Sequence, residues 1–427
     1  MASGTNRVPT PEQLLRHCYA EAIRAVQPQR ALSRTLAPLK PPPTPCWIIA
    51  VGKASNGMAR GIVDWLETHA AEPAGGIIVN AGSTPSPHRA IRVLTGDHPI
   101  PGAKSAAAAR AISETIAAIP PDASVHVAIS GGASALIAGP LAGLTADDVT
   151  ATFKALLSSG LDINEMNAIR KRVTAWSAGR LAAALGRRIL HVWVISDVPG
   201  DDLGSIASGP CTGDSWTRRD VEQLVARHGL AKAFTPAVNR ALGEETIKPG
   251  APELRGVDPQ IIASNRTAVE AAADAAKALG VDTQIMEPGL RGDASSMGRT
   301  IAEALGAGRA PAAVLIWGGE TTVTIAGKAG LGGRAQELAL AAAGVMARQH
   351  LTGTILSAGT DGRDGPTDAA GAIVDGSVWN RIVQAGRDPV RDLANHDAYH
   401  ALDAAGALIR TGPTGTNVTD LVLGTTP

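Results

Sequence analysis

Acidic residues gather on a glycine-rich stretch near the C-terminal end of the sequence. The stretch from Ser357 to Gly376 reads SAGTDGRDGPTDAAGAIVDG and holds four aspartates but no lysine. Asp361 lies at the carboxyl end of the apolar run TILSAG and Asp364 follows three residues later, whereas Asp368 and Asp375 fit turn and cap positions. Carboxylates hold Mg²⁺ together with substrate phosphates. Asp361 and Asp364 are therefore predicted metal ligands, and a solvated loop is the alternative.

Two basic residues stand where they could bind the anion that such a metal would carry. Lys53 lies in VGKASNG, between an apolar run and a predicted helix, and Arg334 lies in GLGGRAQEL, in the first turn of another helix. A cation at a helix N-terminus opposes the helix dipole unless an anion lies between them. The planar guanidinium suits a phosphoryl group or a carboxylate. For Lys53 a surface lysine on a loop is an equally good explanation.

Two further loops follow apolar runs. ISGGASAL (129–136) places Ser130, Gly131, Gly132 and Ser134 between a strand and a helix, where backbone N–H groups could cradle a phosphate. Close packing of the helix on the strand is the alternative.

The second of these loops, ISDVPGDDLGSIASGP (195–210), carries Asp197, Asp201 and Asp202. Asp197 is a predicted Mg²⁺ ligand. For Asp201 and Asp202 a turn or cap role is favoured.

The elements that must position these loops follow one pattern. Apolar runs of four to eight residues end in Gly, Ser or Asp, and a helical pattern follows each of them; the runs are at 46–51, 75–80, 125–129, 189–195, 312–317 and 354–358. This alternation predicts an α/β fold with a mostly parallel sheet. Ligands of such sheets bind beyond the carboxyl ends of the strands. The polar clusters all lie there. A first helix is expected from Thr10-Pro11-Glu12, and a strand hairpin is expected after Trp317.

The length of 427 residues predicts two domains. The boundary is placed in the Pro- and Gly-rich segment 247–260, which gives domains of residues 1–255 and 256–427.

The composition excludes several classes of protein. Lys plus Arg and Asp plus Glu number 39 each, so no overall field favours nucleic acid or an anionic membrane. The three scattered cysteines argue for a reducing compartment, and no signal peptide or membrane span is expected. A cytoplasmic location is therefore expected, and a homodimer stays open. The nearest match to GxGxxG, at 330–335, follows the expected hairpin, which argues against a dinucleotide oxidoreductase. No GxSxG elbow of a serine hydrolase is present.

Eight motifs together resemble the class II glycerate kinases, a two-domain family whose C-terminal part is the MOFRL domain. In order they are VGKAS, GDHPIPGA, SGGASAL, SDVPGDDLGSIASGP, GGETTVT, GGRAQELAL, SAGTDGRDGPTDAAGAIVDG and TGPTGTNVTDL. The resemblance spans nearly the whole chain. It implies a Rossmann-like larger domain, a smaller α/β domain and an active site in the cleft between them.

The resemblance also implies an activity, namely phosphorylation of D-glycerate by ATP and Mg²⁺, usually to 2-phosphoglycerate. Lys53, Asp197 and Arg334 match the important lysine, aspartate and arginine of the family. Nucleotide contacts are expected from Ser130, Gly131, Gly132, Ser134, Gly318, Gly319, Glu320, Gly333 and Asp361, and metal ligands from Asp197, Asp361 and Asp364. A hydroxypyruvate reductase using NAD(P)H and a non-catalytic sensor of small acids or nucleotides are the alternatives. His98 could act as a base, although a turn role is more common.

The sequence departs from the family pattern at five positions. Thr174, Ser177 and Ala178 stand in a segment that usually reads Ser, then Lys-Gly-Gly-Arg; Cys211 replaces Thr and Ala335 replaces Asn. If these residues contact substrate, the acceptor differs from glycerate or binds weakly. The sequence motifs are compatible with phosphorylation of either hydroxyl group of glycerate.

Overall fold

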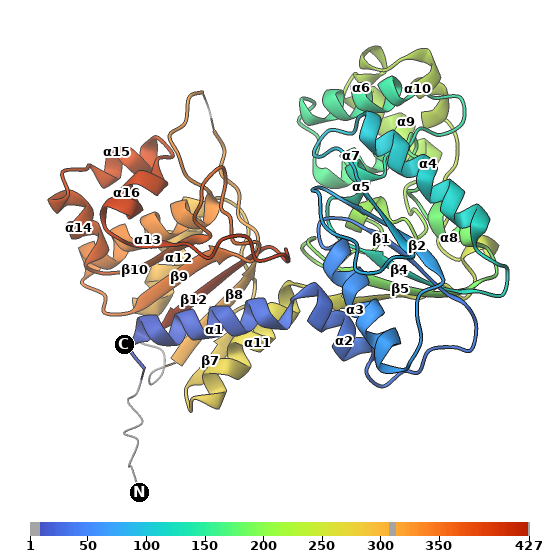
Figure 1. The fold of residues 1–427 in the computed structure, drawn as a ribbon. Coiled ribbons are helices and arrows are strands. Elements are labelled where there is room, and N and C mark those ends of the chain that lie inside the picture. The colour runs from blue at the N-terminus through green and yellow to red at the C-terminus, as the bar shows by residue number, and fades with distance from the viewer. Residues whose placement is uncertain (1–8, 307–312, 326, 426–427) are drawn as a thin grey trace, which may run out of the picture. The chain divides into compact units, whose positions relative to one another are not determined.

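The chain folds into two compact units. In this computed structural model, which describes residues 9–306, 313–325 and 327–425, one unit runs from Pro28 to Ile262. The other combines the chain up to Gln27 with the chain from Ala263 onward. They are called the N-terminal unit and the C-terminal unit below (Figure 1).

The N-terminal unit contains a six-stranded sheet in the order β3-β2-β1-β4-β5-β6. The strands are β1 Cys46–Val51, β2 Gly75–Asn80, β3 Ile91–Thr95, β4 Ser124–Ile129, β5 Ile189–Ile195 and β6 Pro259–Ala263. Neighbouring strands from β3 to β5 pair in parallel. This order is that of the doubly wound Rossmann fold, whose ligands bind where the order reverses, here between β1 and β4. The prediction of a Rossmann-like unit with a parallel sheet is confirmed.

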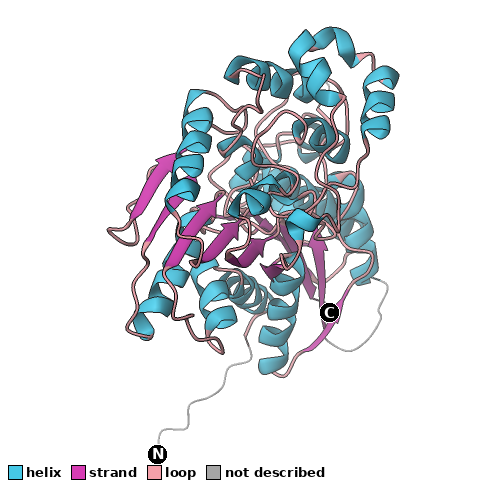
Figure 2. Ribbon diagram, turned by 90° about the vertical axis from the view of Figure 1, so that its right-hand side faces the viewer, coloured by secondary structure: helices cyan, strands magenta, loops and turns pink. Residues whose placement is uncertain are grey.

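Helices cover this sheet and add a separate layer. They are α2 Pro28–Leu36, α3 Ser55–Thr68, α4 Ala103–Ala118, α5 Ala133–Leu136, α6 Ala146–Leu157, α7 Ile163–Arg170, α8 Arg180–Leu185, α9 Arg218–Arg227 and α10 Pro236–Leu242, with short 3₁₀ turns η1 Ile206–Ser208, η2 Leu230–Ala233 and η3 Pro252–Leu254. Residues of β1, β4, β5, α4 and α8 share one apolar core. Helices α6, α7, α9 and α10 enclose a second one. Figure 2, which faces this unit, shows the strands in magenta with helices packed around them. The apolar strands are continuous because both faces of the sheet are buried.

The C-terminal unit contains a second six-stranded sheet in the order β11-β10-β9-β12-β8-β7. The elements are α1 Pro11–Ala25, α11 Asn265–Ala278, β7 Asp282–Ile285, α12 Ala294–Gly306, β8 Ala313–Gly319, α13 Arg334–Gln349, β9 Thr354–Gly359, β10 Gly371–Asp375, α14 Val378–Gln384, α15 Pro389–Ala394, α16 Ala398–Ala404, β11 Leu408–Ile409 and β12 Asp420–Thr425. Among the strand pairs of the described residues, β7 and β8 pair in parallel and the others are antiparallel. A mostly parallel sheet therefore describes the N-terminal unit alone, and the C-terminal sheet is mixed.

The expected hairpin after Trp317 is wrong. β8 ends at Gly319, and the described residues between it and Gly333 form no further strand; Thr322 makes an isolated bridge to Asp293. β8 pairs instead with β12, which starts about a hundred residues later in the chain. Antiparallel pairing with a distant strand leaves no local mark in the sequence, so the Gly-rich segment was mistaken for a turn.

The N-terminal helix α1 belongs to the C-terminal unit, which the predicted division at residue 255 did not anticipate. Thr10 caps this helix in a capping box with Gln13, and Pro11 starts it, as predicted. Its apolar side packs on α11 and on the sheet (Figure 1), and the Tyr19 hydroxyl donates to the Gly359 carbonyl at 2.6 Å. The helix therefore lies beside the carboxyl end of β9, which precedes Asp361.

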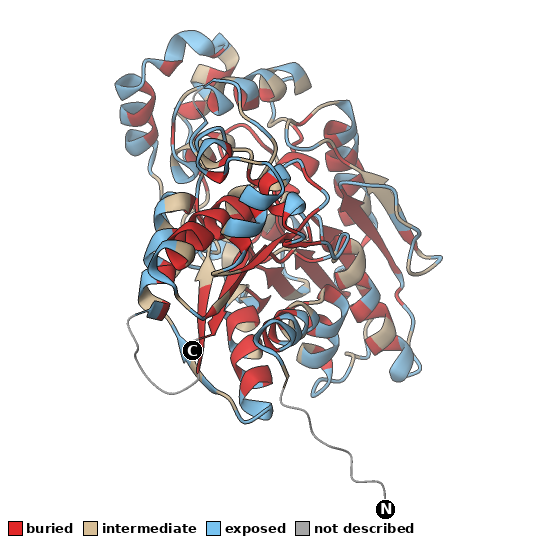
Figure 3. Cartoon of the chain, turned by 90° about the vertical axis from the view of Figure 1, so that its left-hand side faces the viewer, coloured by how far each residue is buried: buried red, intermediate tan, exposed pale blue. Residues whose placement is uncertain are grey.

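The opposite face of this sheet is covered by α12 and α13, and α13 is the most buried helix of the unit. Its side chains are buried from Ala335 to Met346, including the polar Gln336 and Glu337. Figure 3, which faces this unit, shows its strands and inner helical faces in red, as buried. Polar groups at the start of such a helix need partners within the protein.

Within the described residues, no helix combines the length and the apolar character that crossing a membrane requires. The three cysteines Cys18, Cys46 and Cys211 are buried free thiols, and burial raises the pKa of each.

Candidate active site

The turn after β1 positions Lys53 at the reversal of strand order. β1 ends at Val51 and α3 begins at Ser55, so Lys53 lies in the short turn between them. Its backbone N–H donates to the Gly131 carbonyl at 3.0 Å, which ties this turn to the one after β4. The side chain is exposed, and no carboxylate of the described residues lies within ion-pair distance of its ammonium. Lys53 is thus held by its backbone and left available to an anionic ligand.

The turn after β4 contains the predicted phosphate loop. Ser130 donates its N–H to the Val51 carbonyl, and its hydroxyl accepts from the Ala54 N–H, both at 3.0 Å. Gly132 has φ +85°, a left-handed conformation that favours glycine. The helix that follows, α5, has only four residues, so its dipole contributes little here. Any anion binding by this turn rests on its own N–H groups and on Lys53.

The turn after β5 brings Asp197 against the same glycines. A Cβ atom at Gly131 would overlap the Asp197 carboxylate, and one at Gly132 would lie 3.3 Å from the Lys53 side chain. Burial raises the pKa of Asp197, and Lys53 opposes that rise. Lys53 and Asp197, predicted from separate motifs, are therefore neighbours around Gly131 and Gly132.

His98 lies at the same place. Its ring would contact a Cβ at Gly132 at 3.4 Å, and its pKa is lowered by burial and by Lys53. The imidazole is consequently neutral near pH 7 and able to accept a proton. From the sequence, His98 was a possible base, with a turn role given as the more common one. Its position in the GDHPIPGA motif was the sequence signal for a functional role.

The loop after Asp197 is tightly constrained. Asp201, Ala207 and Ser208 all have positive φ, and the Ser208 hydroxyl lies 2.8 Å from that of Ser134. Asp202 accepts from the Gly204 N–H and the Ser205 hydroxyl, which is the turn role favoured for it. Non-glycine residues in this conformation cost about 1–3 kcal/mol each and persist only where their surroundings impose them. The loop thus places Ser134 as well as Asp197.

In the C-terminal unit Arg334 is held by two carboxylates. Its Nε and Nη2 donate to the two oxygens of Asp420 at 2.5 and 3.1 Å, and Nη1 donates to Glu320. Asp420 is the first residue of β12 and is buried. Arg334 does open α13, as predicted, but carboxylates of the protein offset the helix dipole there. Asp420 was missed, although the quoted motif TGPTGTNVTDL contains it.

The predicted acidic residues differ in their surroundings. Asp364 is buried, and its carboxylate accepts from the Ala335 and Gln336 N–H groups at the start of α13. Burial raises the pKa of Asp364 to about 7, against these two hydrogen bonds and Arg334, while Asp420 adds to the rise. Asp361 is half-buried, accepts from the Arg363 N–H at 3.0 Å, and raises the pKa of Asp420. Asp361 is thus the more available of the two.

The predicted glycines of this unit lie around the same groups. Gly318 and Gly319 end β8 beside Glu320, and Gly333 caps α13 against the Asp364 side chain. Each unit therefore carries one cluster. Lys53, His98, Asp197 and the Ser130–Gly132 turn form the first, and Glu320, Arg334, Asp361, Asp364 and Asp420 form the second.

No group of three or more His, Cys, Asp or Glu side chains in the described ranges is arranged to hold a metal ion by itself. That observation fits Mg²⁺, which usually takes one or two carboxylates and completes its shell with water and substrate phosphates.

The five departures from the family pattern lie inside the protein. Thr174 and Ser177 are buried and hydrogen-bonded to each other at 2.7 Å, and Cys211 is part of the apolar core. Ala335 is buried in the first turn of α13. Ala178 has φ +53°, where the usual residue is glycine.

Fold and clusters define a two-unit α/β protein with basic and acidic side chains at the ligand-binding edge of a Rossmann-like sheet. The family model described as a domain of unknown function (DUF4147) matches residues 14–243, and that of the MOFRL family matches residues 313–420. The D-glycerate 2-kinase of Thermotoga maritima is 37% identical over 412 residues, 95% of each chain. A protein of Agrobacterium vitis named as a hydroxypyruvate reductase is also 37% identical, over 96% of this chain and 93% of its own.

The crystal structure of glycerate kinase from Thermotoga maritima superimposes with a TM-score of 0.88 at 35% identity, covering 97% of this chain and 99% of the other. The chain belongs to the glycerate kinase family with a C-terminal MOFRL domain.

Proposed function

We propose that this protein is a kinase that transfers the terminal phosphoryl group of ATP to D-glycerate and forms 2-phosphoglycerate. Its near full-length similarity to a protein named D-glycerate 2-kinase supports the substrate. The observation that carries the proposal is the meeting of Lys53 and Asp197 at the adjacent glycines Gly132 and Gly131, where the strand order reverses between β1 and β4. An exposed ammonium beside a half-buried carboxylate is the pair that phosphoryl transfer to a hydroxyl requires.

In this proposal Lys53 neutralises charge on the transferring phosphoryl group. Asp197 orients the acceptor hydroxyl and accepts its proton, because burial raises its pKa toward the range of an effective base. His98, whose ring lies beside Gly132, is proposed to share that proton. The Ser130–Gly132 turn and Ser134 bind nucleotide phosphates through N–H and hydroxyl groups.

The C-terminal unit contributes Arg334, with its guanidinium oriented by Asp420 and Glu320. Arg334 is proposed to bind the substrate carboxylate or the phosphoryl group. Gly318, Gly319, Glu320, Gly333 and Asp361 remain the proposed nucleotide contacts of this unit.

Asp361 would hold Mg²⁺, because its carboxylate has capacity left after its protein hydrogen bond. Asp197 is the alternative ligand, and would then hold Mg²⁺ instead of acting as the base. Asp364 is a poorer ligand, since both of its oxygens already accept N–H groups of α13. When bound, the cation supplies charge neutralisation to the phosphates. The proposal includes a cytoplasmic location, where ATP is available. It does not include a homodimer.

The test is turnover of ATP and D-glycerate in Lys53→Ala, with Lys104→Ala as a matched control. Both lysines are exposed, and Lys104 lies on α4. Loss of a cation that acts in the transition state should lower kcat by roughly 10²–10⁴ in Lys53→Ala. Equal activity in the two variants would reject the site.

The name of the Agrobacterium relative raises a second candidate, reduction of hydroxypyruvate. The first turn of the parallel sheet reads VGKASNG and lacks the GxGxxG pattern of dinucleotide binding, which disfavours this activity. Consumption of NADH with hydroxypyruvate, followed by absorbance, decides between them.

A further inference from the structure

A pocket in the N-terminal unit, separate from the proposed kinase site, is lined by basic residues that this site does not use. It has a volume of about 400 Å³, within the range of small-molecule sites. Its walls are the segment 141–144, Arg172, Arg180, residues of α10 that include Arg240, and Glu244 just after that helix. None of the predicted catalytic or nucleotide-binding residues lines it.

Arg180 is fixed in place by the chain around it. Its Nη1 donates to the carbonyls of Lys171, Ser177 and Thr174 at 2.8, 3.0 and 3.4 Å. The guanidinium has five donors, and these bonds use only one of its nitrogens. Among the described residues no carboxylate forms an ion pair with Arg180 or with Arg240.

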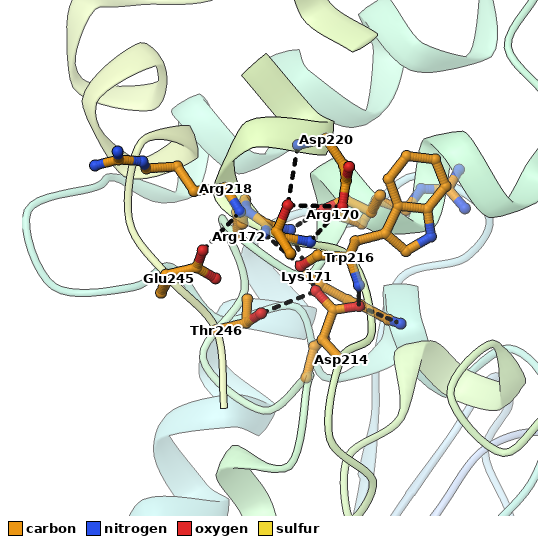
Figure 4. A network of polar contacts seen from close by, with 12 residues as sticks. Arg170, Lys171, Arg172, Asp214, Trp216, Arg218, Asp220, Glu245 and Thr246 are labelled. Carbon is orange, nitrogen blue, oxygen red and sulfur yellow. Dashed lines mark hydrogen bonds and ion pairs between the residues drawn. The ribbon is translucent and has the colours of Figure 1, made fainter. Parts of the chain in front are cut away.

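Arg172 is fully buried behind the pocket, as part of the network in Figure 4. Its Nη1 lies 3.2 Å from Asp214, and Lys171 lies 3.1 Å from the other oxygen of the same carboxylate. The Thr246 hydroxyl also donates to Asp214 at 2.9 Å. Asp214 is therefore shared among these partners and forms no ion pair with Arg180 in the described chain, while the Arg172 Nε is buried there without a hydrogen-bond partner.

The charges around the pocket are consequently unbalanced. Three guanidinium groups line it and Glu244 is the one carboxylate among its described lining residues. Burial lowers the pKa of Arg172 and of Arg180, and Arg172 lowers that of Arg180 further, while Asp214 opposes part of this fall for both arginines. Asp220 and Glu245 act on Arg172 from the exposed side of the network. An anion in the pocket would offset the remaining charge.

We propose that this pocket binds a small organic phosphate, with Arg180 and Arg240 as its contacts. Two arginines presented from different elements suit the several oxygens of a phosphate group, and the pocket volume leaves room for a short carbon chain. The inference does not depend on the kinase proposal.

The test is calorimetric titration of the whole protein with glycerol phosphate, in a Lys53→Ala background that weakens phosphate binding at the proposed active site. We expect Lys53→Ala to bind the probe, and the added change Arg240→Ala to weaken binding at least tenfold. Arg219→Ala is the matched control, since Arg219 is an exposed arginine on α9 that lines no pocket described here. Equal affinity with Arg240→Ala and Arg219→Ala, or no binding in Lys53→Ala itself, overturns the proposal.

A second variant guards against misfolding of Arg240→Ala. Glu244→Gln removes the negative charge and keeps the shape, so it should tighten binding several-fold. Unchanged or weaker binding in Glu244→Gln contradicts a phosphate site.

Discussion

The Arg334 guanidinium donates to both carboxylate oxygens of Asp420, at 2.5 and 3.1 Å. The pair joins the first residue of α13 to the first residue of β12, which are 86 residues apart in the sequence. Such a bidentate contact fixes the plane of the guanidinium as well as its position. Arg334 is thus preorganised by the protein before any ligand arrives.

Asp420→Asn should loosen Arg334 and lower both stability and turnover. The carboxylate is buried but the arginine is about a third exposed, so we expect a loss of about 2 kcal/mol, less than for a fully buried pair. Urea unfolding and kcat measure the two effects. Asp368→Asn, which disrupts an exposed pair with Arg410, should change stability far less, because solvent screens that pair. A fully active Asp420→Asn would show that the guanidinium needs no positioning.

Asp214→Asn should destabilise the N-terminal unit strongly. The change keeps the shape but leaves Lys171 and Arg172 buried without their shared counter-charge, which costs about 3–5 kcal/mol. Tryptophan fluorescence during urea unfolding reports on this unit, because it contains Trp47, Trp65, Trp176, Trp193 and Trp216 of the seven tryptophans. The exposed Asp122→Asn is the control. A loss below about 1 kcal/mol in Asp214→Asn would mean that the cations find other partners.

Ala178→Gly should stabilise the protein. At φ +53° an alanine pays a steric cost of about 1–2 kcal/mol that glycine avoids, and the entropy that glycine loses on folding offsets only part of it. We expect a net gain of up to about 1 kcal/mol in thermal or urea unfolding. The same change at Ala183, inside α8, should have the opposite sign. If both variants lose stability, the left-handed backbone at position 178 is not strained.

Protonation of His126 should destabilise the N-terminal unit in acid. The ring is buried, accepts from the Trp193 indole at 3.0 Å and stacks on His191. Burial, with a smaller effect of His191, lowers the pKa of His126 to about 3. Below pH 6.5 the unfolded chain therefore binds a proton that the folded protein excludes.

Unfolding free energy should consequently fall by about 1.4 kcal/mol per pH unit between about pH 6 and pH 4 from this group. His126→Asn, whose amide oxygen can accept from Trp193, should flatten that slope, and the exposed His17→Asn should leave it unchanged. The slope is measured by urea unfolding at several pH values. An unaltered slope in His126→Asn would assign the acid sensitivity to other groups.

The sequence predicted the parts of the fold that follow from local patterns. Apolar runs such as CWIIAV and ILHVWVI became β1 and β5, and their polar ends placed Lys53 and Asp197 at one edge of a parallel sheet. That edge is shared because parallel strands end together. The cap at Thr10 was also a local signal.

The remainder depended on pairings over long sequence distances. No local feature of Asp420 shows that β12 lies between β8 and β9, so neither the mixed sheet nor the partner of Arg334 was foreseen. The apolar face of α1 could have packed on either unit, and only the structure places it on α11. Asp364 stays a predicted metal ligand, but its contacts with the N–H groups at the start of α13 could not be read from a glycine-rich loop.

Phosphorus NMR of the reaction products tests the kinase account most directly. The purified protein is incubated with ATP, Mg²⁺ and D-glycerate, and the spectrum is compared with that of Lys53→Ala. We predict a phosphate monoester resonance matching 2-phosphoglycerate, formed in step with ADP, and its near absence in the variant. Formation of no phosphorylated acid by the wild-type protein, or equal formation by Lys53→Ala, would contradict the proposed reaction or its site.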